Sequence, residues 1–159
     1  MAASALIDTG AILALLDPGD PWHGSCGTAF RQLRFPLLTS EAVLTETFHL
    51  INRSRKSKET AWKFLRSGAI VLRTIEDAEL SQLKRLMEQY WDQPMDFADA
   101  TLVHLANRES LSAILTIDQA HFATYRLAGK KRFHVLPVER HRDTTRIIAS
   151  APGPPILLS

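Results

Sequence analysis

Five short apolar runs alternate along the chain with longer segments whose apolar pattern suits helices. The runs predict strands over residues 5–7, 35–38, 69–72, 113–117 and 133–138. The longer segments predict helices over about residues 11–16, 22–34, 40–53, 76–91 and 96–108, with one more around Trp62. Chains that alternate strands with helices fold around a mainly parallel sheet. We therefore expect an α/β fold, in which helices flank a mainly parallel central β-sheet.

The length of the chain fits a single domain. It has 159 residues, of which 45% are hydrophobic and 23% charged, and these values exclude a disordered or collagen-like chain. Cys26 is the only cysteine, which excludes an intrachain disulfide and a cysteine-based zinc site. We expect the domain to span residues 1–138. Residues 139–159 are basic and then proline-rich, so we expect a flexible tail outside the compact fold.

The N-terminal segment does not have the pattern of a secretory signal. No Lys or Arg precedes its first apolar run, and Asp8 lies within that run. The longest apolar stretches are far shorter than the roughly 20 residues that a membrane-spanning helix needs. We therefore expect a cytoplasmic protein with no membrane partner.

Several acidic residues lie in apolar surroundings. Asp8 ends the first predicted strand and Asp118 ends a later one, so a parallel sheet would bring both to its carboxyl edge, where open α/β sheets bind ligands. Asp96 and Asp99 lie one turn apart at the start of a helix. Glu46 lies in the middle of a helix, on the face that also carries residues 43, 47 and 50. Acids gathered in one cleft repel one another unless a cation neutralises them, and hard oxygen ligands suit Mg²⁺ or Mn²⁺.

Each of these acids also has a purely structural interpretation. Asp96 suits the N-cap of a helix, where Asp99 favours the helix dipole. Asp118 could end a strand and cap the next helix, and Glu46 could pair with Arg53. Asp8 is the hardest to explain in this way, because an acid inside an apolar run needs a partner.

Taken together, the acidic motifs resemble those of the PIN-domain ribonucleases, particularly the VapC-type toxins of bacterial type II toxin–antitoxin pairs. The motifs that carry the resemblance are Ala5-Leu6-Ile7-Asp8-Thr9-Gly10-Ala11, Thr45-Glu46, Asp96-Phe97-Ala98-Asp99-Ala100, and Leu115-Thr116-Ile117-Asp118 followed by Phe122. Each motif alone is common, but their order and spacing fit the family. The resemblance covers about residues 5–138.

The resemblance implies a metal-dependent endoribonuclease that hydrolyses RNA phosphodiester bonds. The implied metal ligands, which are also the catalytic residues, are Asp8, Glu46, Asp99 and Asp118, with Asp96 as an auxiliary acid. Thr9 and Thr116 would place hydroxyl groups beside these acids, and the implied cofactor is one or two Mg²⁺ or Mn²⁺ ions. Two positions depart from the family pattern. Gly10 stands where many members have Ser, and His121 stands where some members have a further acid, which leaves the number of ions open.

The resemblance also implies three partners: an RNA substrate, a cognate antitoxin and a second copy of the chain. The net charge is only +2, but residues 53–66 hold six basic residues and one acid, and residues 126–146 hold seven and two. The rest of the chain, which contains the proposed metal ligands, is acidic. The candidates for binding RNA phosphates are Arg53, Arg55, Lys56, Lys58, Lys63, Arg66, Arg126, Lys130, Lys131 and Arg132.

Two alternatives to the nuclease hypothesis stay open. A PIN-like scaffold could bind RNA or protein without cutting. Asp8-Thr9-Gly10 after Ala-Leu-Ile also matches the signature of retroviral-type aspartic proteases, although that fold is almost entirely β and this chain predicts many helices. We expect the three tryptophans to be core or dimer-interface anchors rather than base-stacking platforms.

Overall fold

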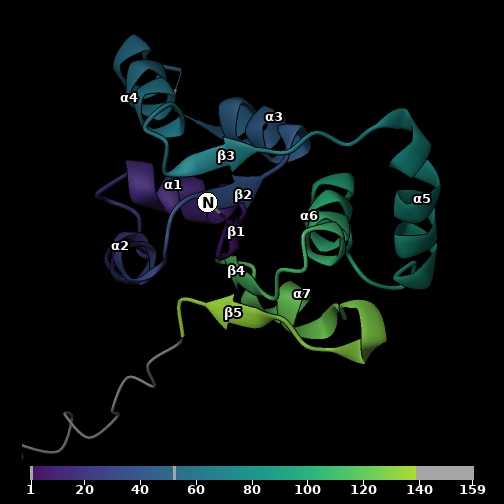
Figure 1. Cartoon of the computed structure of the whole chain (residues 1–159). Helices are drawn as coiled ribbons and strands as arrows, with labels where there is room; N and C mark the ends of the chain where they lie inside the picture. Colours follow the sequence, from purple (N-terminus) through teal and green to yellow (C-terminus); the bar gives the residue numbers. More distant parts are fainter. Residues whose placement is uncertain (1, 52, 139–159) are drawn as a thin grey trace, which may run out of the picture.

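The computed structural model describes residues 2–51 and 53–138 (Figure 1). The predicted tail, residues 139–159, lies outside the described residues. Within them, the chain folds around a five-stranded sheet with the strand order β3-β2-β1-β4-β5, in which every neighbouring pair is parallel. The strands are β1 (Leu6–Ile7), β2 (Leu37–Thr39), β3 (Ile70–Leu72), β4 (Ala113–Leu115) and β5 (His134–Leu136). The predicted α/β fold with a parallel sheet is confirmed.

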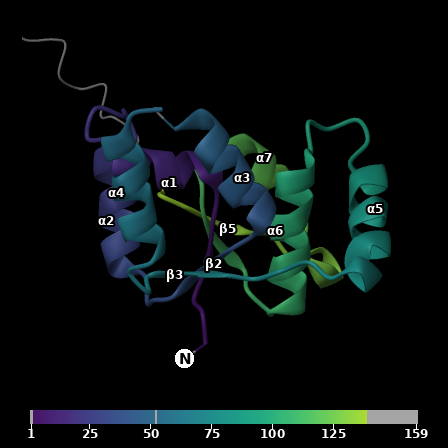
Figure 2. The same cartoon turned by 90° about the horizontal axis from the view of Figure 1, so that it is seen from above.

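Helices cover both faces of this sheet. They are α1 (Thr9–Leu16), α2 (His23–Gln32), α3 (Glu41–Leu50), α4 (Arg55–Leu65), α5 (Leu80–Gln89), α6 (Phe97–Arg108) and α7 (Gln119–Thr124), with short 3₁₀ helices η1 (Asp77–Glu79) and η2 (Ala128–Lys130). Figures 1 and 2 show α1, α2 and α4 on one side of the sheet and α3, α5 and α6 on the other. None of the described helices is long and apolar enough to cross a membrane.

Several elements differ from the prediction, and three of the differences have a local explanation. The strand predicted over 113–117 ends at Leu115, because the Thr116 hydroxyl accepts a hydrogen bond from the backbone N–H of Asp118 and turns the chain into α7. The helix predicted over 76–91 is divided into η1 and α5, since a capping box between Glu76 and Glu79 starts a 3₁₀ turn. Helix α7 was not predicted, because its six residues are too few to show an apolar period.

The core lies between the sheet and its helices. β1 and Ala5 before it are fully buried, and every fully buried side-chain nitrogen or oxygen in the described residues has a hydrogen-bond partner. Of the three tryptophans, Trp22 is half-buried and packs against the core, whereas the exposed fractions of Trp62 and Trp91 are 53% and 87%. A core role therefore fits Trp22 alone, and a role of the others at a dimer interface stays a prediction.

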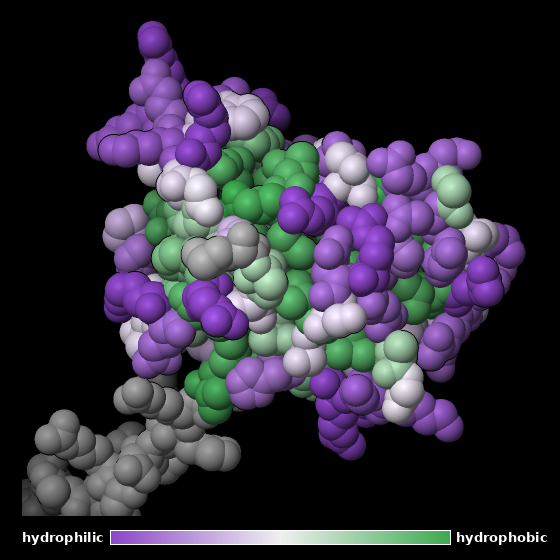
Figure 3. Space-filling model, viewed as in Figure 1, coloured by the Kyte–Doolittle hydropathy of each residue, from purple (hydrophilic) through white to green (hydrophobic). Residues whose placement is uncertain are grey.

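The two edges of the sheet differ in character. The N-terminus marks the amino edge, at the bottom of Figure 2, and the loop from α5 into α6 lies at the top. Figure 3 looks onto the amino edge, where hydrophobic residues gather in the middle and hydrophilic residues cover α4 and the side of α5. The acids that follow β1 and β4 therefore lie on the far side of the molecule in this view.

Candidate active site at the carboxyl edge of the sheet

Two acids emerge side by side from the centre of the sheet. Ile7 of β1 is in register with Leu115 of β4, and the strands are parallel. The backbone N–H of Asp8 donates to the carbonyl oxygen of Leu115 at 3.0 Å. Asp8 and Asp118 thus leave neighbouring strands at the same edge, as predicted from the parallel sheet.

Asp8 is held in one orientation by two hydrogen bonds. Its side chain is almost completely buried, at 5% exposure. Oδ1 accepts from the backbone N–H of Thr9 at 2.7 Å and caps α1, while Oδ2 accepts from the hydroxyl of Thr116 at 2.9 Å. Burial raises the pKa of Asp8 to about 6, and Asp118 and Glu46 add to this, although the two hydrogen bonds act in the opposite direction.

Asp99 is the second buried acid, and a tyrosine orients it. Asp99 is also 5% exposed, and its Oδ2 accepts a hydrogen bond from the hydroxyl of Tyr125 at 2.9 Å. Burial raises the pKa of Asp99 to about 7, with further contributions from the charges of Asp96, Asp8 and Asp118. Sequence reasoning missed Tyr125, since it belongs to none of the four motifs.

The remaining three acids surround this buried pair. Asp96 is the N-cap of α6 and accepts from the backbone N–H of Asp99 at 2.8 Å, so its structural interpretation is correct. Glu46 is half-buried on α3, and its pKa is raised by burial and by the charges of Asp96 and Asp118, against a hydrogen bond from Thr9. Asp118 is exposed. Each of the five carboxyl groups is therefore within electrostatic reach of at least two of the others.

The helix face that carries Glu46 is only partly apolar. Val43 and Thr47 are buried, but Leu50 is 56% exposed. The hydroxyl of Thr9 lies 3.3 Å from the carbonyl oxygen of Val43, to which it donates, and also contacts Glu46. Thr9 and Thr116 thus both lie beside the acids, where the resemblance placed them.

The chemistry of this cluster fits a hard divalent cation. Its donors are all carboxylate oxygens, the ligands that Mg²⁺ and Mn²⁺ prefer. No basic side chain among the described residues forms an ion pair with any of the five acids, and burial raises the pKa values of Asp8 and Asp99. In their present orientations, no three His, Cys, Asp or Glu side chains among the described residues are close enough to form a ligand set. Binding a cation would therefore require side chains of the cluster to turn toward it.

Gly10 has a steric explanation. A Cβ atom on Gly10 would lie 2.4 Å from Cγ1 and 2.7 Å from Cδ1 of Ile117, so the isoleucine occupies the space that a serine side chain would need. The other departure from the family pattern, His121, lies half-buried on α7.

The structure separates the candidate RNA-binding residues into two groups. Helix α4 leads into β3, so its start, with Arg53, Arg55, Lys56 and Lys58, lies toward the carboxyl edge and the acids (Figure 2). The segment 126–132 leads into β5, which is the outermost strand on the other side of the sheet from β3. Because it precedes its strand, this segment lies toward the amino edge. The prediction did not anticipate this separation.

The basic side chains also differ in how strongly other protein groups already bind them. The guanidinium of Arg126 donates to the carbonyl oxygens of Ala123, Thr124 and Tyr125, so it holds the end of α7. Arg55 pairs with Glu59 one turn along α4, in an exposed pair. Exposed ion pairs of this kind contribute little to stability, so Arg55 can exchange its partner for a phosphate.

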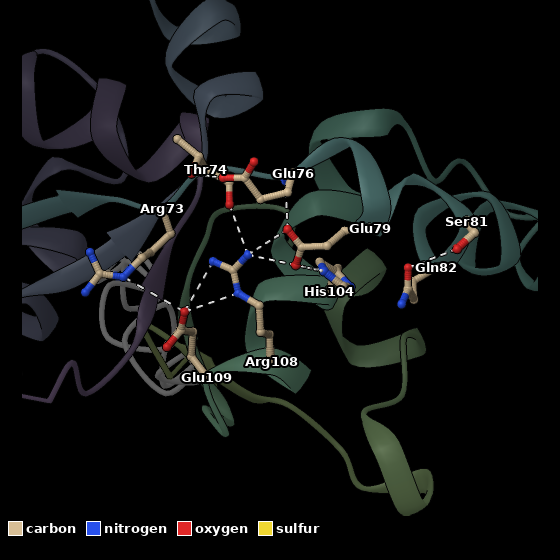
Figure 4. A network of polar contacts seen from close by, with 9 residues as sticks. All are labelled: Arg73, Thr74, Glu76, Glu79, Ser81, Gln82, His104, Arg108 and Glu109. Carbon is tan, nitrogen blue, oxygen red and sulfur yellow. Dashed lines mark hydrogen bonds and ion pairs between the residues drawn. The ribbon is translucent and has the colours of Figure 1, made fainter.

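The other end of α6 is held by a polar network (Figure 4). Glu79 of η1 accepts from the Nη1 of Arg108 at 2.8 Å and pairs with Nε2 of His104 at 2.8 Å. Arg108 also donates to the carbonyl oxygen of Thr74 at 3.0 Å. The backbone N–H of Glu76, and then the contacts of His104 and Arg108, lower the pKa of Glu79 to about 2. The network fixes α6 against the segment that crosses from β3 to α5.

Comparison with known proteins identifies the family to which this fold belongs. A sequence model of the PIN domain family matches residues 5–127, most of the described chain. The chain therefore belongs to the PIN-domain family.

Two related proteins indicate which kind of PIN-domain protein the chain resembles. Ribonuclease VapC26 of Mycobacterium tuberculosis (strain ATCC 25618 / H37Rv) is 35% identical over 134 residues, which are 83% of this chain and 99% of that protein. The crystal structure of M. tuberculosis VapC20, a toxin that cleaves the sarcin–ricin loop, matches with a TM-score of 0.64 at 22% identity, over 70% of this chain and 87% of that one. The first comparison confirms the prediction of a VapC-type ribonuclease, and the second confirms the fold.

Proposed function

We propose that this VapC-type ribonuclease hydrolyses RNA phosphodiester bonds with a divalent cation held by Asp8, Glu46, Asp99 and Asp118, and with Asp96 as an auxiliary acid. The observation that carries the proposal is the convergence of five carboxyl groups at the carboxyl edge. Two of them are buried with pKa values raised to about 6 and 7. Since no basic side chain among the described residues pairs with these acids, the cluster favours a cation, and it lies at the carboxyl edge, where open α/β sheets bind ligands.

The acids would bind the cation and so orient the RNA phosphate, and one of them would also accept a proton from the attacking water. When bound, Mg²⁺ or Mn²⁺ supplies a Lewis acid that activates water and neutralises charge on a phosphate oxygen. Thr116 and the N–H of Thr9 hold both oxygens of Asp8. A carboxylate of the cluster takes the proton of the attacking water, a role that suits a group with a pKa near the working pH.

The basic residues at the start of α4 would hold the RNA backbone. Lys56 and Lys58 are exposed near the start of α4, which lies toward the same carboxyl edge as the acids, so they are the candidates to bind phosphates beside the scissile bond. The segment 126–132 lies toward the other edge, which favours the α4 residues as the main phosphate contacts.

We also propose an antitoxin partner. The relatives are VapC proteins, one of them described as a toxin, and a cell that carries an active ribonuclease of this kind must control it. An antitoxin would cover the acidic edge and insert an Arg or Lys among the carboxylates, where the charge is complementary. Such a pair would act in the cytoplasm, and we expect the ribonuclease to be a homodimer.

The test compares the wild type with Asp8→Asn, and with Asp92→Asn as a matched control. Asp92 is exposed and lies in the turn before α6, so the control makes the same chemical change outside the cluster. With Mn²⁺ and total RNA, we expect cleavage by the wild type and Asp92→Asn, and loss of at least ~100-fold in Asp8→Asn. Addition of EDTA should stop cleavage, and induced expression should arrest growth only for the cleaving variants.

Two outcomes would contradict the proposal. If the wild type binds RNA but leaves all of it intact with Mn²⁺, the chain is a PIN-like binding module. If Asp8→Asn cleaves as fast as the wild type, the acidic cluster is not the active site.

A further inference from the structure

Tyr125 lies just after α7, at a position that its surroundings fix. Its side chain is completely buried. The ring packs edge-on against Tyr90 at 5.1 Å and against Phe122 at 5.3 Å between centroids, and the backbone N–H donates to the carbonyl oxygen of His121. The hydroxyl group therefore has a defined place, which a flexible side chain would not provide.

That hydroxyl binds one oxygen of Asp99 and leaves the other free. Tyr125 donates to Oδ2 of Asp99 at 2.9 Å. No other side chain or backbone group among the described residues hydrogen-bonds to Oδ1. Since no fully buried side-chain oxygen in this part of the chain lacks a partner, Oδ1 is reached by solvent. Asp99 thus presents a single open oxygen to the cluster.

The other buried acid, Asp8, also receives one side-chain hydroxyl group, although its second oxygen is bound as well, by the backbone N–H of Thr9. Thr116 donates to Oδ2 of Asp8, so each buried carboxyl group receives one hydroxyl group. Both hydroxyls come from residues 116–125, although Asp8 precedes α1 and Asp99 belongs to α6. A single segment after β4 therefore orients two acids from two other elements.

We propose that Tyr125 is a positioning residue, which holds Oδ2 of Asp99 so that Oδ1 is presented to the divalent cation and the scissile phosphate. This inference rests on the proposed function. Residues that orient metal ligands in this way commonly change metal affinity by about 10- to 100-fold when they are removed.

The test uses Tyr125→Phe, which removes only the hydroxyl and keeps the ring packing. Tyr90→Phe is a matched control, because Tyr90 belongs to the same aromatic cluster but its hydroxyl accepts from the backbone N–H of Arg126 and contacts no acid in the described structure. Mn²⁺ affinity of the full chain is measured by titration with electron paramagnetic resonance. We expect Tyr125→Phe to weaken binding about tenfold, and Tyr90→Phe to stay within twofold of the wild type.

Kinetics and thermal unfolding separate positioning from a merely structural role. We expect Tyr125→Phe at saturating RNA to have a lower kcat with little change in KM, because the RNA contacts are intact. A structural role would lower the melting temperature of both variants and leave Mn²⁺ affinity unchanged. Unchanged Mn²⁺ affinity in a folded Tyr125→Phe variant would overturn the inference.

A spectroscopic readout on the wild type covers the case in which Tyr125→Phe does not fold. The chain contains only two tyrosines, so incorporation of 3-fluorotyrosine gives two fluorine resonances, and Tyr90→Phe assigns them. We expect Mg²⁺ to shift the Tyr125 resonance and to leave that of Tyr90 in place. If saturating Mg²⁺ does not shift the Tyr125 resonance, the inference is overturned. If the wild type nevertheless cleaves RNA, the proposed function still holds. A wild type that binds neither metal overturns both.

Discussion

The hydroxyl group of Thr116 joins Asp8 and Asp118, two acids that are 110 residues apart in the sequence. It donates to Oδ2 of Asp8 at 2.9 Å and accepts from the backbone N–H of Asp118 at 3.0 Å. Thr116 is completely buried, so water cannot replace either contact. One threonine therefore fixes the orientation of one acid and the backbone that places the other.

Replacing Thr116 should lower activity by more than the accompanying loss of stability can explain. Thr116→Val removes the hydroxyl that binds Oδ2 of Asp8 and the Asp118 amide, and leaving a buried group without its hydrogen bond costs about 1–3 kcal/mol of unfolding free energy. Thr39→Val is the matched control, because the Thr39 hydroxyl is equally buried and donates to the carbonyl oxygen of Ile7 at 3.0 Å. We expect both variants to lose similar stability in urea denaturation, and only Thr116→Val to lose about tenfold or more in kcat/KM. Equal activities would contradict the assigned role.

The metal-free protein should lose stability as the pH rises from about 4 to 7. Burial raises the pKa of Asp8 to about 6 and of Asp99 to about 7, whereas the unfolded chain releases these protons near pH 4. The folded state therefore binds more protons over this range, and its free energy of unfolding falls with pH. We expect urea denaturation in EDTA to give a higher midpoint at pH 5 than at pH 8, and Mg²⁺ to raise the midpoint at pH 8.

The control for this pH dependence is Asp8→Asn, which should flatten the decline between pH 5 and 8. Glu79 acts in the opposite direction. Its pKa is lowered to about 2, so its contribution is present above about pH 4.5 and is lost as the pH falls toward 2. The prediction is contradicted if the urea midpoint of the wild type in EDTA rises from pH 5 to pH 8 and Asp8→Asn shows the same rise. The buried acids would then not titrate as described.

A serine at position 10 should be tolerated only when Ile117 is smaller. In Gly10→Ser the new Cβ overlaps Ile117, and such overpacking costs about 1–3 kcal/mol. Gly10→Ser should therefore cost less unfolding free energy in the Ile117→Ala background than in the wild type. A double-mutant cycle of unfolding free energies measures this difference. Gly24→Ser is the control, because a Cβ on Gly24 meets nothing within 4 Å. Strictly additive effects would rule out the overlap.

The two basic segments should differ in their effect on RNA binding. Replacing both Lys56 and Lys58 by Ala should weaken binding and reduce the slope of log affinity against log salt by about 1.4, since single-stranded nucleic acid loses roughly 0.7 per phosphate contact. The same change at Lys130 and Lys131, toward the amino edge, should leave the slope unchanged. Filter binding of an uncleaved RNA to the Asp8→Asn background measures both, and an equal reduction in the two pairs would contradict the proposed path of the RNA.

Much of the site could be predicted because its signals are local. Asp8 and Asp118 each follow an apolar run, and a parallel sheet brings such positions to one edge without further information. Tyr125 could not be found in this way, because its partner Asp99 lies 26 residues earlier and only the packing of α7 against its neighbours brings the two together. The steric role of Ile117 at Gly10 is likewise invisible until the strand end and α1 are placed in space.

The fold shows the same division between local and distant causes. The strand order and the separation of the two basic segments depend on how crossovers are arranged, and apolar spacing does not report this. His104 would be a simple packing residue by its place among leucines, but in the structure it pairs with Glu79 of a distant turn.

The polar network at Glu79 gives the two ends of α6 different sensitivities to salt. The end at Arg108 is fixed largely by charges, and that arginine is still 29% exposed, so dissolved ions can weaken its attachment. The end that carries Asp99 is fixed by the buried hydroxyl of Tyr125 and by the N-cap hydrogen bond of Asp96, and neither contact is an ion pair that salt could screen. High ionic strength would therefore loosen the helix from the end remote from the acids, and the acidic edge would keep its shape in conditions that already weaken binding of RNA phosphates.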